Sequence, residues 1–309
     1  MMDKINNGII SKPRDPRDYV KGVSSPIPYL VRLDTGNWSP FLSQKQSQKY
    51  AGWETNDCWC LSGINDIETQ MNFLTSKGQF PKEALDFFTN NGYFDSNGLF
   101  DLSERFIGII SGAKDEGNDP IELWRLSRIN GVLPRSDLAY TDALGAQFGS
   151  QTAFAADYFD PKYIKTEMRQ KALNFLKYVD IAYEWLGKEW VQPNLIDMRA
   201  SLYQSPLHIC VPVNMQTWNS GTVIYDGSKD VAHAVLNWAI EKDGRYDFRD
   251  QYNPYDKTLS ADYYIPLCIH GVVTPILPPP YTPPVTAQPY PQTIWSKVWQ
   301  AVYQWFRNQ

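Results

Sequence analysis

Apolar residues recur at steps of three and four positions through much of the first two thirds of the chain, a spacing that predicts amphipathic helices. The clearest run lies at residues 56–76, where Leu61, Ile64, Met71 and Leu74 fall on one face. Further helices are predicted at residues 83–89, 102–110, 119–130 and 160–187. We therefore expect this part of the fold to be mainly α-helical.

A different pattern begins near residue 207. Short runs rich in β-branched and aromatic residues are separated there by Gly, Asn and Asp, which predicts strands joined by turns. The predicted strands lie at residues 207–213, 222–226, 233–241, 245–252 and 263–269. A helical region followed by a β-rich region predicts the α+β class.

Both ends of the chain differ from this central part. Residues 1–28 contain four prolines that break any helix, so we expect an extended N-terminal arm. Residues 274–292 form a proline-rich linker of the polyproline type. Residues 293–309 then show the pattern of a short amphipathic helix rich in aromatic residues. This helix fits docking on the main body or binding to a partner protein, whereas a membrane interface is disfavoured because Lys297 and Arg307 are its only cations.

The composition is that of a folded protein and excludes several classes. Hydrophobic residues make up 43% of the chain and charged residues 20%, close to the average for globular domains. The net charge of -5 provides no basic field for a phosphate backbone, so no nucleic-acid partner is expected. No apolar run reaches the about 20 residues of a transmembrane helix. The first residues also lack the apolar core of a secretory signal, so we expect no signal peptide.

Cys58 lies where three potential N-capping residues, 55–57, meet the first turn of a predicted helix. Backbone N–H groups and the positive end of the helix dipole stabilise a thiolate at such a position, which favours a nucleophile. A lone Cys in an apolar helix is more often a small buried hydrophobic residue. Cys58 and Cys60 also form a Cys-x-Cys pair, but zinc needs four ligands and no second pair is visible, so no metal is expected. The four cysteines are expected to be free thiols.

Several segments resemble those of papain-like cysteine peptidases and occur in the same order as in that family. The run SPFLSQ at residues 39–44 resembles the strand that ends at the oxyanion-hole glutamine, and CWCLSG from Cys58 resembles the start of the nucleophile helix. DLSERFIG at residues 101–108 and RINGVLPRSDLAY at residues 128–140 resemble two later segments. HAVLNWAIE from His233 resembles the strand that the catalytic histidine opens. Similar divergent sequences occur in bacteria and their phages.

The resemblance implies a papain-like fold of two subdomains within residues 29–273. A helical nucleophile subdomain over residues 45–195 would carry Cys58, and an antiparallel β-rich subdomain over residues 196–273 would carry His233. The active site is then expected in the cleft between the two subdomains, where such sites preferentially form.

The resemblance also implies the site residues and the reaction of a cysteine-type endopeptidase. Cys58 is the implied nucleophile and His233 its base, while Asp250 would orient the imidazole. Gln44 is the implied donor to the oxyanion. The enzyme would hydrolyse peptide bonds of a protein or peptide substrate through a thioester acyl-enzyme, without a cofactor.

Some features depart from the family pattern. Asp250 stands where the family has Asn, and Tyr252 stands where it has Trp. Thirteen residues separate Gln44 from Cys58, more than in papain, so other glutamines are alternative oxyanion donors. These alternatives are Gln46 and Gln48. An arm of 28 residues is too short for the usual inhibitory pro-segment, so autoinhibition of that kind is not expected.

Two other functions fit the same residues. A catalytically inactive papain-like module would serve as a structural or binding protein of a phage virion. A hydrolase of peptidoglycan cross-links would use the same Cys-His chemistry on a different substrate. Retention of Cys58, His233, a carboxylate and a glutamine together favours the peptidase. We expect a cytoplasmic or virion-associated protein.

Overall fold

The computed structural model describes residues 8–10, 19–21, 26–188, 190–214 and 216–277. The chain up to Leu277 groups into one unit. Most of the predicted N-terminal arm, most of the predicted linker and all of the predicted terminal helix lie outside the described residues. Among the described residues, no helix has both the length and the apolar content that a membrane span needs.

Helices dominate the chain up to residue 175. They are α1 (Cys58–Ser76), α2 (Lys82–Asn90), α3 (Glu104–Ile110), α4 (Ile121–Asn130), α5 (Asp142–Gly145), α6 (Gln151–Tyr158) and α7 (Thr166–Phe175). Short 3-10 helices lie at Ser39–Phe41, Arg135–Asp137 and Pro161–Tyr163. A later helix, α8 (Leu195–Leu202), packs against strands of the sheet. The helices predicted at residues 56–76, 83–89, 102–110 and 119–130 are confirmed.

The strands form a seven-stranded sheet in the order β3-β9-β4-β6-β7-β8-β5. They are β3 (Val179–Trp185), β4 (Leu207–Pro212), β5 (Thr222–Val223), β6 (Val231–Ile240), β7 (Tyr246–Arg249), β8 (Asp256–Leu259) and β9 (Leu267–Pro275). Neighbouring strands are antiparallel, except that β5 and β8 are parallel. A separate hairpin consists of β1 (Lys49–Tyr50) and β2 (Trp53–Glu54).

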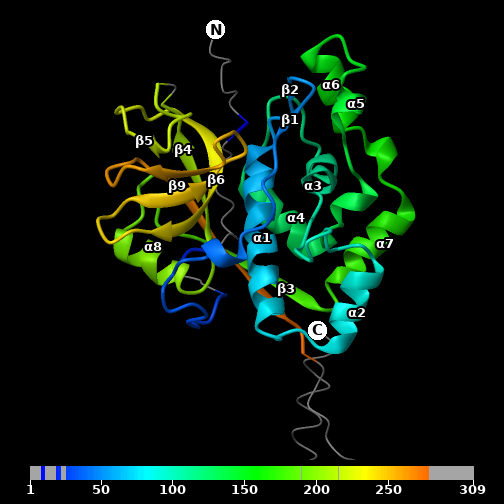
Figure 1. Cartoon of the computed structure of the whole chain (residues 1–309), viewed down its shortest axis with the longest axis horizontal. Coiled ribbons are helices and arrows are strands. Elements are labelled where there is room, and N and C mark those ends of the chain that lie inside the picture. The colour runs from blue at the N-terminus through cyan, green and yellow to red at the C-terminus, as the bar shows by residue number, and fades with distance from the viewer. Residues whose placement is uncertain (1–7, 11–18, 22–25, 189, 215, 278–309) are drawn as a thin grey trace, which may run out of the picture. The chain divides into compact units, whose positions relative to one another are not determined.

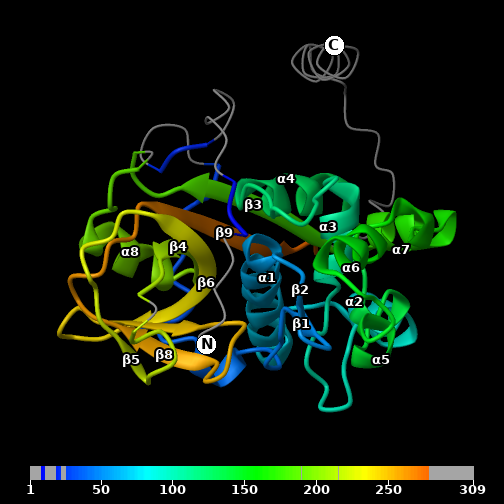
Figure 2. The ribbon, with the colours of Figure 1, turned by 90° about the horizontal axis from the view of Figure 1, so that it is seen from above.

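Helix α1 lies between the sheet and most of the other helices (Figure 1). Its residues from Cys58 to Leu74 are all buried, and a helix buried on every face belongs to a core. It contacts β6 and β9 on the sheet as well as α3 and α4. Viewed from above, β6 bends strongly beside α1 (Figure 2). Helix α1 and strand β6 are therefore close enough to contribute residues to one site.

The segment at residues 160–187, predicted as one helix, is helical only in its first part. Helix α7 ends at Phe175, and β3 follows and pairs with β9 at the edge of the sheet. The first four residues of β3 alternate between buried and more exposed positions, which is the period of a strand. The sheet therefore takes one strand from the range predicted for the helical subdomain. Strand β8 was not predicted, and β9 continues to Pro275, inside the range predicted for the linker.

Candidate active site

Cys58 is the first residue of α1 and is completely buried. Asp57 is the N-cap, and its carbonyl oxygen accepts hydrogen bonds from the N–H groups of Cys60 and Leu61, each at 2.8 Å. N–H groups at the start of a helix lack intrahelical acceptors, and together with the helix dipole they favour negative charge. Cys58 therefore lies at a position where the backbone stabilises a thiolate.

His233 and Asp250 meet at one end of two neighbouring strands. His233 is the third residue of β6, and Asp250 directly follows β7. The strands pair with Leu236 opposite Arg249, which brings the residue after β7 close to His233. Nε2 of His233 lies 2.6 Å from Oδ1 of Asp250, and neither side chain is exposed. The structure thus brings together two of the residues that the resemblance implied.

The imidazole of His233 also interacts with the side chain of Cys58. Because Asp250 occupies Nε2, the interaction with the sulfur falls to Nδ1, which has no conventional hydrogen-bond partner among the described residues. Burial opposes the charged form, but the interactions with Asp250 and Cys58 outweigh it and raise the pKa of His233 to about 10. The surroundings of His233 therefore favour its charged imidazolium form at neutral pH.

Both oxygens of Asp250 are engaged. Oδ1 accepts from His233 and from the backbone N–H of Gln251 at 2.7 Å. Oδ2 accepts from Nε1 of Trp218 at 2.8 Å and from Nζ of Lys257 at 2.5 Å. Burial acts to raise the pKa of Asp250, but the adjacent imidazolium and ammonium hold it below its usual value. Asp250 is therefore a fixed carboxylate that keeps the imidazole in one orientation.

The other two histidines are held in structural roles. His208 bonds to Oγ of Ser62 at 2.8 Å and accepts from Nε1 of Trp124 at 3.2 Å. Burial lowers the pKa of His208 to about 3, so it stays neutral. Nδ1 of His270 lies 2.9 Å from Glu184, and burial lowers the pKa of His270 as well. His233 is the histidine whose side chain interacts with Cys58.

The ring of Tyr252 packs against His233. The centroids of the two rings lie 5.5 Å apart. The Tyr252 hydroxyl donates to Oε2 of Glu54 at 2.9 Å and accepts a hydrogen bond from the side-chain amide of Gln48. Burial, with the charges of Glu54 and Cys58, raises the pKa of Tyr252, which keeps the hydroxyl neutral. Gln48 is thereby tied to the residue that packs on His233.

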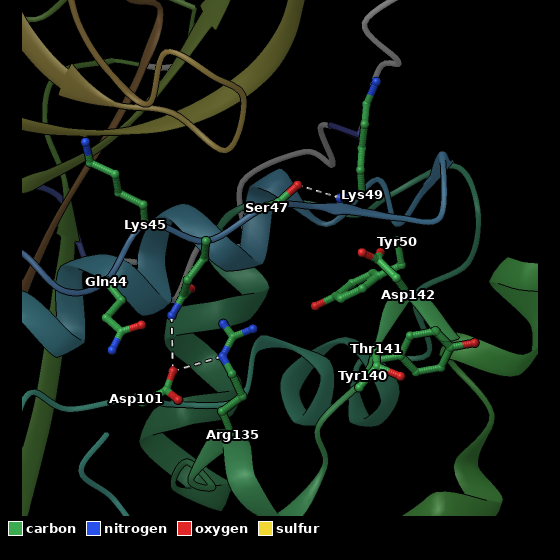
Figure 3. Close-up of a pocket in the computed structure, with 11 residues that line it drawn as sticks. Gln44, Lys45, Ser47, Lys49, Tyr50, Asp101, Arg135, Tyr140, Thr141 and Asp142 are labelled. Atoms are coloured by element: carbon green, nitrogen blue, oxygen red, sulfur yellow. Dashed lines mark hydrogen bonds and ion pairs between the residues drawn. The ribbon is translucent and has the colours of Figure 1, made fainter. Parts of the chain in front are cut away.

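The two other candidate glutamines face different partners. The amide of Gln44 donates to Asp95, and that of Gln46 lies 3.4 Å from Asp101. Both residues line a polar pocket of about 410 Å³ whose lining includes the Asp101–Arg135 ion pair, and Figure 3 shows this pair near Gln44. Neither Cys58 nor His233 lines this pocket.

The β1–β2 hairpin accounts for the long separation between the glutamines and Cys58. The carbonyl oxygen of Gln48 accepts from the backbone N–H of Thr55 at 2.9 Å and from its hydroxyl at 3.1 Å. The hairpin lies between these two residues and returns the chain to the same place. Gln48 is therefore next to a residue only three positions before Cys58, although its separation in the sequence is larger.

A buried acidic group directly precedes the nucleophile candidate. Oδ2 of Asp57 accepts from the hydroxyl of Tyr158 at 3.0 Å, and that hydroxyl lies 3.3 Å from Oε1 of Glu104. Arg135 pairs with Glu104 at 2.8 Å. Burial and the charge of Glu104 raise the pKa of Asp57 to about 7. Asp57 therefore exchanges its proton near neutral pH.

The cysteines are free, buried thiols, as expected. Sγ of Cys60 donates to the carbonyl oxygen of Glu104 at 3.4 Å, so the second member of the Cys-x-Cys pair points to the backbone of α3. Within the described ranges, no group of three or more His, Cys, Asp and Glu side chains is arranged to hold a metal ion.

Sequence reasoning missed two residues that hold Asp250. Trp218 lies in the loop after β4, and its ring packs edge-on against His233 with centroids 5.4 Å apart. Lys257 lies in β8 and is buried. Neither belongs to a segment that resembles the family. The one available signal was the two-residue period of the strand at residues 256–259, which places Lys257 on the same face as Leu259.

The arrangement is that of a Cys-His-Asp constellation between a helix start and a sheet, and the comparisons agree with this fold. No protein-family model and no curated protein matches the sequence. Among solved structures, xylellain, a cysteine protease from Xylella fastidiosa, is similar with a TM-score of 0.57 and 17% identity, over 89% of this chain and 98% of that one.

A second similar structure contains the cysteine protease and lectin-like domains of Cwp84, a surface layer associated protein of Clostridium difficile. Its TM-score is 0.50 at 12% identity, over 88% of this chain and 57% of that one. The chain therefore has the α+β fold of papain-like cysteine proteases. The predicted resemblance is confirmed at the level of the fold.

Proposed function

We propose that the protein is a cysteine endopeptidase in which Cys58, His233 and Asp250 form the catalytic triad. The observation that carries this proposal is the placement of His233, whose imidazole interacts with Cys58 and bonds to Asp250 at 2.6 Å. The nucleophile starts a helix and the base starts a strand of the sheet, in a papain-like fold. Chemistry and fold thus support the same class of reaction.

In the reaction, the Cys58 thiolate attacks the carbonyl carbon of a peptide bond, and the carbonyl electrons move to oxygen. When this tetrahedral species collapses, the C–N bond breaks and the amine leaves with the proton from Nδ1 of His233. A thioester to Cys58 remains. His233 then takes a proton from water, whose oxygen attacks the thioester, and the thiolate leaves. Asp250 keeps Nε2 engaged, so Nδ1 continues to face the sulfur.

We assign the side-chain donor to the oxyanion to Gln48 rather than to Gln44. The amide of Gln48 reaches Tyr252, which packs on His233, whereas that of Gln44 is committed to Asp95. The backbone N–H of Cys58, at the start of α1, is the second donor. A rotation of the Gln48 side chain toward a bound carbonyl would exchange Tyr252 for the developing oxyanion.

Complete burial of Cys58 is the observation that favours the second candidate, a catalytically inactive papain-like module. An inactive module would retain the fold but would never expose the sulfur. The peptidoglycan hydrolase uses the same triad and differs only in its substrate. A location in the cytoplasm or in a virion stays a prediction.

The test of the proposal is hydrolysis of an unfolded protein substrate, such as denatured casein, by the wild type and by Cys58→Ala. The wild type is expected to release peptides, and the variant to release none while unfolding at the same temperature. Cross-linked peptidoglycan serves as a parallel substrate. Cleavage by Cys58→Ala would rule out Cys58 as the nucleophile. Cleavage of peptidoglycan but not of casein would change the proposed substrate from proteins to peptidoglycan.

A further inference from the structure

Lys257 places a fully buried positive charge behind the triad. Its Nζ lies 2.5 Å from Oδ2 of Asp250, the oxygen that does not bond to His233, and 5.1 Å from the centroid of the Trp218 ring. The pairing of Phe248 with Lys257 between β7 and β8 fixes its position. An ammonium is buried only where a partner compensates its desolvation, and Asp250 is that partner.

The charges around His233 show what this cation does. The imidazole faces the Asp250 carboxylate, the Cys58 sulfur and the neutral hydroxyl of Tyr252, behind which lies Glu54. Because these side chains are buried, a carboxylate without a second cation beside it would hold the imidazolium more tightly and make it a weaker acid than it is in the presence of Lys257. A general acid with too high a pKa protonates a leaving amine slowly.

We propose that Lys257 is a positioning residue of the triad: its ammonium offsets part of the negative charge of Asp250 and so limits how tightly this carboxylate binds the imidazolium of His233. The inference rests on the proposed function. It explains how Asp works at the position where papain-like peptidases have Asn. The amide of Asn carries no charge, whereas the charge of the Asp250 carboxylate is partly offset by a second residue.

The test measures the rate at which a thiol-directed epoxide alkylates Cys58 between pH 5 and about 11.5, in the full-length chain. Epoxide opening needs the thiolate and a proton donor, so the rate falls at high pH when His233 loses its proton. This fall in rate is the alkaline limb of the pH profile. Lys257→Met is expected to shift the limb to a higher pH by about one unit, and Asp250→Asn to shift it to a lower pH by a similar amount. The double variant Asp250→Asn/Lys257→Met removes both charges and should return the limb close to that of the wild type.

The double variant keeps the test informative if either single variant unfolds, because it buries no unpaired charge. An alkaline limb that stays in place in Lys257→Met would overturn the proposal and leave Lys257 with a purely structural role. A double variant whose limb remains shifted would do the same. Failure of the proposed function itself looks different, because Cys58 of the wild type would then not be labelled selectively at any pH.

Discussion

Nε2 of His233 lies 2.6 Å from Oδ1 of Asp250, and neither side chain has exposed surface. Lys257, also buried, holds the other oxygen of the same carboxylate. Three ionisable side chains thus share a space without exposure to solvent, and each depends on the others for its charge. This dependence determines how substitutions separate activity from stability.

Replacing Asp250 with Ala is expected to reduce kcat/KM less than replacing Cys58 or His233, because the nucleophile and the base remain. The same change leaves the Lys257 ammonium buried without a partner, which costs about 3–5 kcal/mol in the free energy of unfolding. Asp250→Ala/Lys257→Met should regain most of this stability but not the activity, since His233 still lacks its acceptor. Urea unfolding and peptide hydrolysis measure the two quantities. Recovery of both in the double variant would assign Asp250 to stability alone.

Gln48→Ala is expected to lower kcat by about 100- to 1,000-fold, the usual effect of losing one donor to an oxyanion. Gln44→Ala is the matched control and should stay within about twofold of the wild type, because its amide donates to Asp95 and the pocket that Gln44 lines does not include Cys58. Steady-state kinetics on one peptide substrate compare the two. The opposite ranking would return the oxyanion role to Gln44, as the family resemblance implied.

The raised pKa of Asp57, about 7 in the folded chain, predicts a pH-dependent stability. The unfolded value is about 3.9, so the folded state binds more protons between these two values and stability falls as the pH rises through this window. Asp57→Asn, which cannot ionise, should therefore gain stability over the wild type from pH 4 to about 7, by at least about 1 kcal/mol, and then keep a constant advantage.

Urea midpoints at pH 4, 6 and 8 measure this effect. Asp180→Asn is the control, because that side chain is exposed in β3 and the change should affect the midpoint little at any of these values. An advantage of Asp57→Asn that shrinks as the pH rises would contradict the sign of the shift.

Helices α1 to α4 could be predicted because their apolar spacing is regular and local, whereas α5, α6 and α8 were not predicted. Cys58 could be placed at a helix start for the same reason, since capping residues and the helix pattern adjoin it. Strand β3 was predicted as helix because a segment rich in Ala, Leu and Lys precedes it, and its pairing with β9 joins distant parts of the chain. Pairing of that kind leaves little trace in a local pattern.

The residues of the site also fall into those that the sequence could predict and those that it could not. His233 and Asp250 were predicted as partners through their family segments, and the structure places them in contact. The role of Lys257 could not be predicted, because it depends on which buried group the lysine meets after folding. A lysine in a short polar run carries no local mark of such a contact.

The measurement that tests the central claim most directly is intact-mass analysis after brief exposure to a limiting amount of a thiol-directed epoxide near neutral pH. The account predicts a single adduct on Cys58, which is lost in His233→Ala. All four cysteines are buried, so general accessibility does not favour one of them. Adducts spread evenly over the cysteines, or an adduct on Cys58 that persists in His233→Ala, would contradict a thiolate activated by His233 and would favour the inactive module.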